Sequence, residues 1–158
     1  MRRSDREVKS REEILEILSK CDVVRLGINT YDYPYVVPLN FGIETGGDSI
    51  ILWFHSAPEG IKLVNIQKDP RVGFETDCSH KLIAGENACN FTMEYESVIG
   101  CGNVSIPNDN ESKRRGLQSI MRHYVNEKEF SFSDSNLSAV SVLRLDVVQI
   151  TGKRLKVL

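Results

Sequence analysis

Apolar residues recur along most of the chain in short alternating runs, which is the pattern of half-buried β-strands. The clearest run lies at positions 34–42, and its odd-numbered residues are predicted to share one face: Tyr35, Val37, Leu39 and Phe41. Val36, Pro38 and Asn40 then face the other way. Because proline has no N–H to give to a ladder, we expect this strand at a sheet edge, or interrupted at Pro38.

The same patterns predict the remaining elements. Strands are expected at 23–28, 50–54, 71–77, 90–106 and 139–158, helices at 10–21, 56–68 and 111–127, a hairpin turn at Gly46-Gly47, a loop or broken edge at 78–89, and a polar loop at 129–138. Gly100 and Gly102 within one strand, and the shift of apolar positions from Val147 to Val148 in another, each indicate a β-bulge. Antiparallel-style strands with short turns favour a small β-barrel whose openings are covered by helices.

The most informative stretch passes from a strand straight into a helix. Ser56 fits the helix N-cap, Pro58 fits the first turn, and Glu59 stands three residues after the cap, which together make a capping box. The free N–H groups and the positive end of the helix dipole at such a junction bind anions. Since His55 and Lys62 stand beside it, the junction is interpreted as a phosphate site.

A purely structural explanation of the same stretch stays open. Ser56 would then only cap the helix, Lys62 would be solvated, and His55 would only end a strand. Glu59 also counts against an anion, because a carboxylate in the first turn repels phosphate unless it points away. The signal is weaker than that of a P-loop, which has more glycines and a fixed lysine position.

Length, charge and composition exclude several classes of function. The 158 residues suit a single domain, 1–158, with a sizeable core. A charged fraction of 27% and a formal net charge of −2 do not give the basic excess of a nucleic-acid binder. The first residues lack the apolar region of a secretory signal, and no run approaches the roughly 20 apolar residues of a membrane span. We therefore expect a cytoplasmic protein without nucleic-acid or membrane partners.

The other titratable groups carry little functional signal. The four cysteines make no CxxC pair and are expected to stay thiols. The spacing of Cys78, His80 and Cys89 matches no common zinc site, so no metal is expected. His123 lies beside the apolar stripe of helix 111–127 and is interpreted as structural. The runs Lys113-Arg114-Arg115 and Arg2, Arg3, Arg6 are interpreted as a solvated helix face and a basic N-terminal arm.

Six segments resemble, in this order, the split-barrel flavoproteins related to pyridoxamine 5′-phosphate oxidase: MRRSDRE, YPYVVPLNFG, WFHSAPEGIKL, DPRVGFE, YESVIGCGNV and VVQITGK. Within that family the chain is most similar to the nitroimidazole-resistance proteins. Each segment is a weak motif singly, but together they cover most of the chain. The resemblance implies a mainly β fold with flanking helices, a Greek-key antiparallel split β-barrel.

The resemblance also implies a homodimer with FMN at the subunit interface. The residues implied to lie along the flavin ring, with their backbone groups free to hydrogen-bond, are Val37, Pro38, Leu39 and Asn40. Those implied at the phosphate end are His55, Ser56 and Lys62, and those implied to complete the pocket from the second subunit are Ser97 and Val98. Haem binders and deazaflavin users belong to the same family, so these cofactors stay open as alternatives.

The function that follows is an FMN-dependent oxidoreductase acting on a small molecule, and nitroaromatic compounds such as 5-nitroimidazoles are the implied acceptors. His55 is the candidate catalytic residue, because an imidazole can both donate and accept a proton. The alternative is a flavin- or haem-binding module that stores or senses its cofactor without turnover, with His55 or His123 as haem ligands. A domain that has lost its cofactor and only binds other proteins is the third possibility.

Overall fold

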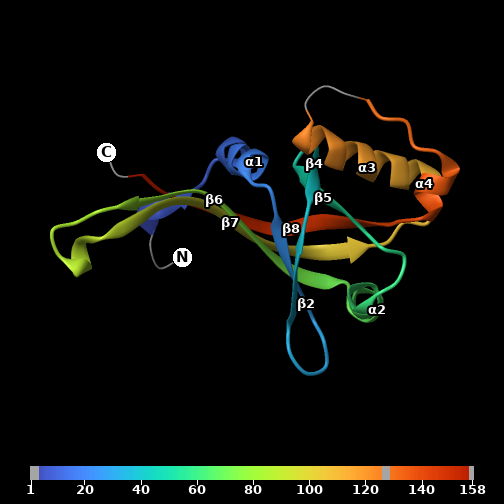
Figure 1. Ribbon diagram of the computed structural model, residues 1–158, viewed down its shortest axis with the longest axis horizontal. Coiled ribbons are helices and arrows are strands. Elements are labelled where there is room, and N and C mark those ends of the chain that lie inside the picture. The colour runs from blue at the N-terminus through green and yellow to red at the C-terminus, as the bar shows by residue number, and fades with distance from the viewer. Residues whose placement is uncertain (1–3, 126–128, 157–158) are drawn as a thin grey trace.

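The computed structural model describes residues 4–125 and 129–156. Within these ranges it holds one eight-stranded sheet and four α-helices (Figure 1). The strands are β1 (Glu7–Val8), β2 (Val24–Ile28), β3 (Tyr35–Leu39), β4 (Phe41–Gly46), β5 (Ser49–Ser56), β6 (Arg71–Ile83), β7 (Thr92–Ser105) and β8 (Ser141–Leu155). The helices are α1 (Arg11–Lys20), α2 (Ile61–Lys68), α3 (Asn110–Tyr124) and α4 (Asp134–Ser138), with short 3-10 helices η1 (Ser4–Arg6) and η2 (Ala88–Asn90). Arg2 and Arg3 of the predicted basic arm lie outside the described residues.

The sheet closes on itself through a single residue. Its strand order is β3-β2-β6-β7-β8-β5-β4, with β1 added beside β8, so β3 and β4 are the two edges. These edge strands are also consecutive in the chain, and only Asn40 separates them. A one-residue link cannot span an open sheet, so the sheet must curl until its edges meet. This confirms the split β-barrel and the edge position of the strand that contains Pro38.

Two apolar layers hold the barrel. The interior contains side chains from every large strand and from α1 and α2, among them Ile17, Leu26, Phe41, Phe54 and Val98. A second, smaller layer lies between α3 and the outside of β5 and β8, and it contains Ile51, Trp53, Ile120 and Val142. Strand β5 is therefore buried on both faces, which explains why its sequence is a continuous apolar run rather than an alternation.

Helix α3 approaches the barrel closely at two glycines, Gly116 on the helix, which lies against Trp53 and Val142, and Gly42 on β4. A Cβ atom on Gly42 would stand 2.3 Å from the backbone carbonyl carbon of Ser119. Any larger residue at this position of β4 would push the helix away from the second apolar layer.

Most predicted elements are confirmed, and the bulges predicted in the two strands are one and the same irregularity between β7 and β8. Ser10 caps α1, since its hydroxyl accepts from the N–H of Glu13 at 3.3 Å. The register between β7 and β8 shifts after Cys101, and Val148 is the extra residue on β8. The hairpin turn lies one residue later than predicted, because Gly46 still pairs with Ser49.

The structure refines two predictions about loops and helix faces and contradicts a third, the polar loop at 129–138. Of the loop or broken edge predicted at 78–89, residues 78–83 are the broken edge: they continue β6 beyond a bulge between Cys78 and Lys81 and pair with β7 alone (Figure 1, left). The polar segment 129–138 contains α4, which buries Leu137 completely. In the run 113–115, Arg114 and Arg115 are exposed as predicted, but the Lys113 ammonium donates to the carbonyls of Leu137 at 2.9 Å and Val140 at 3.0 Å. The end predicted for the third helix, 126–127, lies outside the described residues.

A buried carboxylate fastens α1 to the sheet. The side chain of Glu96 on β7 is 2% exposed and accepts from Arg154 Nε at 2.5 Å, Ser79 Oγ at 2.9 Å and Lys20 Nζ at 3.2 Å. Burial by itself would raise the pKa of Glu96, but these three donors outweigh it and hold the pKa below its usual value.

We predict that stability is lost in acid through this group. A carboxyl whose pKa is lower in the folded than in the unfolded chain stabilises the fold above its unfolded pKa, about 4.3, and this contribution disappears as the pH falls through the folded pKa. Glu96→Gln should lower the free energy of unfolding at neutral pH by about 1.5–3 kcal/mol and flatten the acid limb of a pH series of urea unfolding curves. Exposed Glu86→Gln is the matched control, and equal effects of the two substitutions would contradict the assignment.

Candidate functional site

The junction between β5 and α2 differs from the prediction at its cap. Ser56 is still the last residue of β5, where it pairs with Ser141, and its hydroxyl donates to the carbonyl of Ala57 at 2.8 Å. The predicted capping box of Ser56 and Glu59 is therefore wrong, because the ladder with β8 keeps Ser56 in the strand. The helix begins five residues later, after Gly60, whose φ of 142° and ψ of 165° suit only glycine.

With the helix starting at Ile61, the charged residues near its first turn favour an anion more than the predicted start at Ser56 did. Lys62 becomes the second residue of α2 and is half-buried, whereas Glu59 falls outside the helix. The first N–H groups of a helix have no carbonyl partner within it, and the dipole there is positive. Apart from Gly60 and its two chain neighbours, no described atom lies within 4 Å of the place that a Cβ of Gly60 would occupy, so the space beside the helix start is open there.

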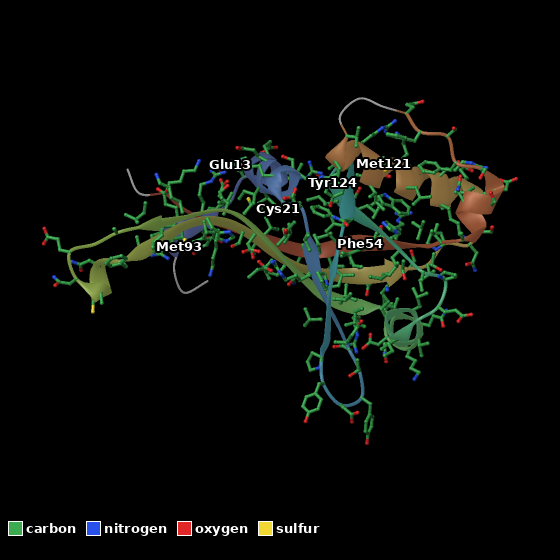
Figure 2. All side chains as sticks on the ribbon, in the orientation of Figure 1. Glu13, Cys21, Phe54, Met93, Met121 and Tyr124 are labelled. Atoms are coloured by element: carbon green, nitrogen blue, oxygen red, sulfur yellow. The ribbon has the colours of Figure 1, made fainter. Side chains whose placement is uncertain are left out.

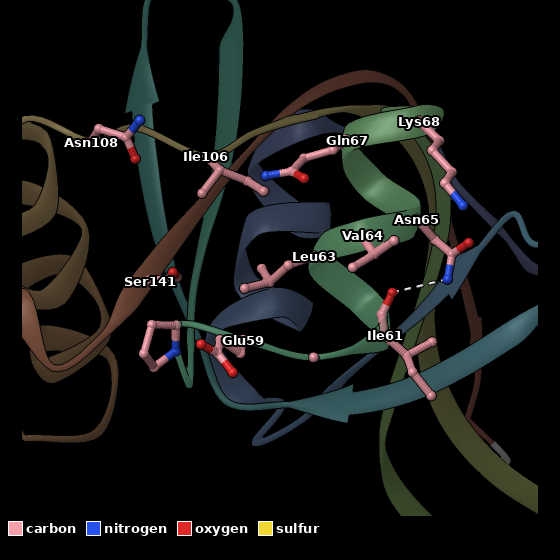
Figure 3. Close-up of a pocket in the computed structure, with 12 residues that line it drawn as sticks. Glu59, Ile61, Leu63, Val64, Asn65, Gln67, Lys68, Ile106, Asn108 and Ser141 are labelled. Atoms are coloured by element: carbon pink, nitrogen blue, oxygen red, sulfur yellow. Dashed lines mark hydrogen bonds between the residues drawn. The ribbon is translucent and has the colours of Figure 1, made fainter.

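A cavity of about 660 Å³ runs along the same helix and includes its start at Gly60 and Ile61. Figure 3 shows it between α2 and the segments that carry Ile106, Asn108 and Ser141. Glu59 lines this cavity and Lys62 does not. Gly60 and Ile61 at the start of α2 line the same cavity, so the carboxylate that counted against an anion site stays beside the helix start.

His55 and Ser56 point to opposite faces of β5. Ser56 follows the alternation of Leu52 and Phe54, which face the barrel interior, and is 6% exposed. His55 follows Ile51 and Trp53 onto the α3 face, where it is exposed and borders a second cavity. The two neighbours therefore do not act as one pair of side chains on a common ligand.

The segment predicted to lie along a flavin ring forms the barrel edge. Val37 and Leu39 pack against the interior, while Val36 and Pro38 are exposed on the outside. Since β3 pairs only with β2, its other backbone edge is free of ladder partners within the sheet. An edge of this kind offers N–H and C=O groups to a bound molecule.

The corner at Asn40 is held by Tyr124, which sequence reasoning assigned only to an apolar stripe. The Tyr124 hydroxyl accepts from the N–H of Phe41 at 3.1 Å and from Asn40 Nδ2 at 3.2 Å. It donates in turn to the carbonyl of Asp22 at 2.6 Å. A tyrosine at the end of a predicted helix was the available signal, because its hydroxyl usually finds a partner.

His123 supports the same corner and has the structural role predicted for it. Its Nε2 lies 2.7 Å from the carbonyl of Cys21, and its ring centroid lies 4.4 Å from that of Phe41. The C-terminal turn of α3 thus holds the β3–β4 corner from one side.

Ser97 and Val98 lie on β7, between β6 and β8. Val98 is fully buried in the barrel interior, so its side chain is not available to a ligand. Ser97 stands opposite Asp77 and Lys153 and is half-buried on the outer face of the sheet. A contact between Ser97 and a cofactor therefore has to be made from the outside of the barrel.

Metal ligands and membrane-spanning helices are not found in the described ranges. No group of three or more His, Cys, Asp or Glu side chains there could hold a metal ion, and the four cysteines are free. Burial raises the pKa of Cys21 to about 12. No helix within residues 4–125 and 129–156 is long and apolar enough to cross a membrane.

Comparison with known proteins identifies the class. The described fold is a split barrel, and the sequence pattern of the pyridoxamine 5′-phosphate oxidase family matches residues 10–154. The chain therefore belongs to the pyridoxamine 5′-phosphate oxidase family. It matches none of the curated proteins with which it was compared.

Solved structures agree with this assignment. A protein of Bacteroides thetaiotaomicron, provisionally described as a 5-nitroimidazole antibiotic resistance protein, is 36% identical over 93% of this chain and 85% of its own, with a TM-score of 0.81. The flavocytochrome Anf3 of Azotobacter vinelandii is 18% identical over 99% of this chain and 72% of its own, with a TM-score of 0.82. A FAD- and haem-binding protein of Mycobacterium smegmatis is 15% identical over 96% and 74%, with a TM-score of 0.83. The last two show the fold alone.

We predict that Tyr124→Phe loosens the barrel corner. The change removes the hydroxyl that accepts the hydrogen bond from the N–H of Phe41, so the free energy of unfolding should fall by about 1–3 kcal/mol. The amide proton of Phe41 should also exchange faster with solvent. Tyr31→Phe is the matched control because Tyr31 is fully exposed at the tip of the β2–β3 hairpin. Unchanged exchange at Phe41 in the Tyr124 variant would contradict the role.

Proposed function

We propose that the chain is an FMN-dependent oxidoreductase that reduces nitroaromatic compounds such as 5-nitroimidazoles. The observation that carries the proposal is the start of α2, where Lys62 and the positive end of the helix lie beside the open space at Gly60 in a chain of this family. The nitroaromatic acceptor is supported by the 36% identity to the Bacteroides protein and by that protein's description.

The residues present fit an FMN at this place. Lys62 and the first N–H groups of α2 would hold the phosphate, and the free backbone edge of Val37, Pro38, Leu39 and Asn40 would take hydrogen bonds from the ring. Ser56 could join the phosphate only by giving up its bond to the Ala57 carbonyl. When bound, the flavin supplies the electron transfer, while the protein supplies position and electrostatics.

His55 is the proposed proton donor and acceptor of the reaction. Its imidazole stands at the end of β5, exposed on the α3 face beside a cavity, so a small molecule can reach its ring nitrogens. A group that exchanges a proton with the reduced acceptor has to lie within hydrogen-bond reach of it.

We also propose that the protein is a homodimer. Strand registers place Val36, Gly27, Gly73, Cys101 and Gln149 in one row on the outer face of the sheet. The neighbouring Ile99 is 49% exposed and Val148, on the bulge, is 65% exposed. A second copy would cover this face and bring its Ser97 and Val98 segment to the cofactor. Light scattering that shows only monomer at micromolar concentration would refute the dimer.

Lys62→Ala should weaken FMN much more than it weakens folding. A charge-assisted hydrogen bond to phosphate is worth roughly 1.5–3 kcal/mol, or about ten- to a hundred-fold in the dissociation constant. Isothermal titration of the flavin-free protein should show this loss for FMN but not for riboflavin, which lacks the phosphate. Lys68→Ala, at the other end of the same helix, is the matched control. Equal affinity of the unsubstituted protein for FMN and riboflavin would show that no phosphate site exists here.

The activity itself is tested by the fate of the reduced flavin. After anaerobic reduction of the FMN-loaded protein, addition of a 5-nitroimidazole should reoxidise the flavin faster than dissolved oxygen does. His55→Gln should slow this step while leaving the FMN dissociation constant nearly unchanged, since Lys62 provides the phosphate contact. Reoxidation by oxygen alone would favour a cofactor-binding module without turnover.

A further inference from the structure

A second cavity, of about 450 Å³, lies outside the barrel beneath α3. It is bounded by β5, α3 and the segment that includes α4 and leads into β8. The residues that line it are His55, Leu117, Ile120, Met121, Phe132, Asn136, Ala139 and Val140. Its volume falls within the range of roughly 300–1,000 Å³ typical of small-molecule sites.

The cavity is the unfilled end of the second apolar layer. Ile51 and Trp53 of β5 fill this layer against Ile120. The next residue on the same face of the strand is His55, which is exposed, so a polar ring stands where a further apolar side chain would have closed the layer. The space above it stays open, and Asn136 is the one other polar residue among the described residues that line it.

Asn136, an exposed residue that lines this space, carries a hydrogen-bond donor of fixed orientation. Its Oδ1 accepts from the N–H of Ser133 at 3.1 Å, as part of the capping box of α4. Because an N–H can only donate, the oxygen of the amide must face Ser133. The amide nitrogen Nδ2 is then left without a partner among the described residues, and it belongs to a side chain that lines the cavity.

The chemistry of the lining selects the class of ligand. No described lining residue is an aspartate, glutamate, lysine or arginine, so a charged molecule would lose its hydration without gaining an opposite charge. Phe132, Met121 and Leu117 suit the faces and edges of an aromatic ring. Asn136 Nδ2 requires a hydrogen-bond acceptor, and an imidazole can serve as either donor or acceptor.

We propose that this cavity binds a neutral, planar aromatic molecule that carries a conjugated oxygen acceptor. The ring lies among Leu117, Met121 and Phe132, and the oxygen accepts from Asn136 Nδ2. The proposed function gives such a molecule a role, as the electron acceptor beside His55, and only this role rests on it. Binding to the cavity requires neither flavin nor turnover, so the two claims can fail separately.

Acetophenone and α-methylstyrene are the matched probes, because they differ only in a carbonyl oxygen replaced by a CH₂ group. Binding is followed by NMR of isotope-labelled methionine methyl groups in the full chain, without added flavin. Met121 lines the cavity, whereas Met93 lies at the far end of the molecule in the β6–β7 hairpin (Figure 2). Acetophenone should shift the Met121 signal saturably, leave the Met93 signal in place, and bind about ten-fold more tightly than α-methylstyrene.

Two substitutions separate the oxygen contact from the cavity. Asn136→Asp keeps an oxygen for the Ser133 cap but removes the Nδ2 donor, so acetophenone should lose its advantage while α-methylstyrene binds as before. Ala139→Leu, at a position with ordinary φ of −77° and ψ of −8°, fills the space and should abolish the binding of both probes. An unshifted Met93 signal and an unchanged melting temperature show that each variant is folded.

Three results would overturn the proposal. The first is the absence of any saturable shift at Met121, and the second is an equal shift at Met93, which would mean non-specific binding. The third is equal affinity for the two probes in the unsubstituted protein, which would remove Asn136 from the site. Binding of acetophenone without any binding of FMN would preserve the cavity and contradict only the proposed function.

Discussion

The link of one residue between β3 and β4 is the constraint on which the rest of this structure depends. Both strands are edges of the same sheet, and Asn40 alone connects them, so the sheet has to roll until the edges come together. The two edges meet without a ladder between them, which leaves the backbone of β3 available on one side. Tyr124 and His123 hold this corner from α3 through bonds to Phe41 and to the carbonyls of Asp22 and Cys21.

The same closure determines what surrounds the edge. Once β4 and β5 are fixed by the corner, β5 is buried on both of its faces and ends with His55 on the α3 side. The chain then turns at Gly60 into α2, whose first residues include Lys62. The end of β5 therefore places the His55 imidazole at an apolar cavity. Six residues after Ser56, the cation of Lys62 lies at the open start of α2. The proposed oxidoreductase function uses both features.

The sequence predicted the elements whose structure follows from residues close together in the chain. The alternation of apolar and polar residues, together with Pro38 inside the strand, was enough to predict β3 as an edge. The shift of apolar positions around Val148 was enough to predict the bulge in β8. It failed at Ser56, because a local capping signal competed with a ladder to Ser141 that lies 85 positions away in the chain. The same limit hid the role of Tyr124, which bonds to Asp22 and Phe41, and the cavity at Asn136, which only the packed fold encloses. Helix α4 was missed although its Ser133–Asn136 capping box is a local signal.

The central claim is that two copies of this chain complete a site for FMN around the barrel edge. Native mass spectrometry of the protein loaded with FMN tests it most directly, because one spectrum reports both the number of chains and the number of cofactors. The account predicts a particle of two chains with two FMN molecules, and a lower FMN occupancy at the same cofactor concentration, with the dimer retained, on Lys62→Ala. A single chain, or a dimer that carries no FMN at saturating cofactor, would contradict it.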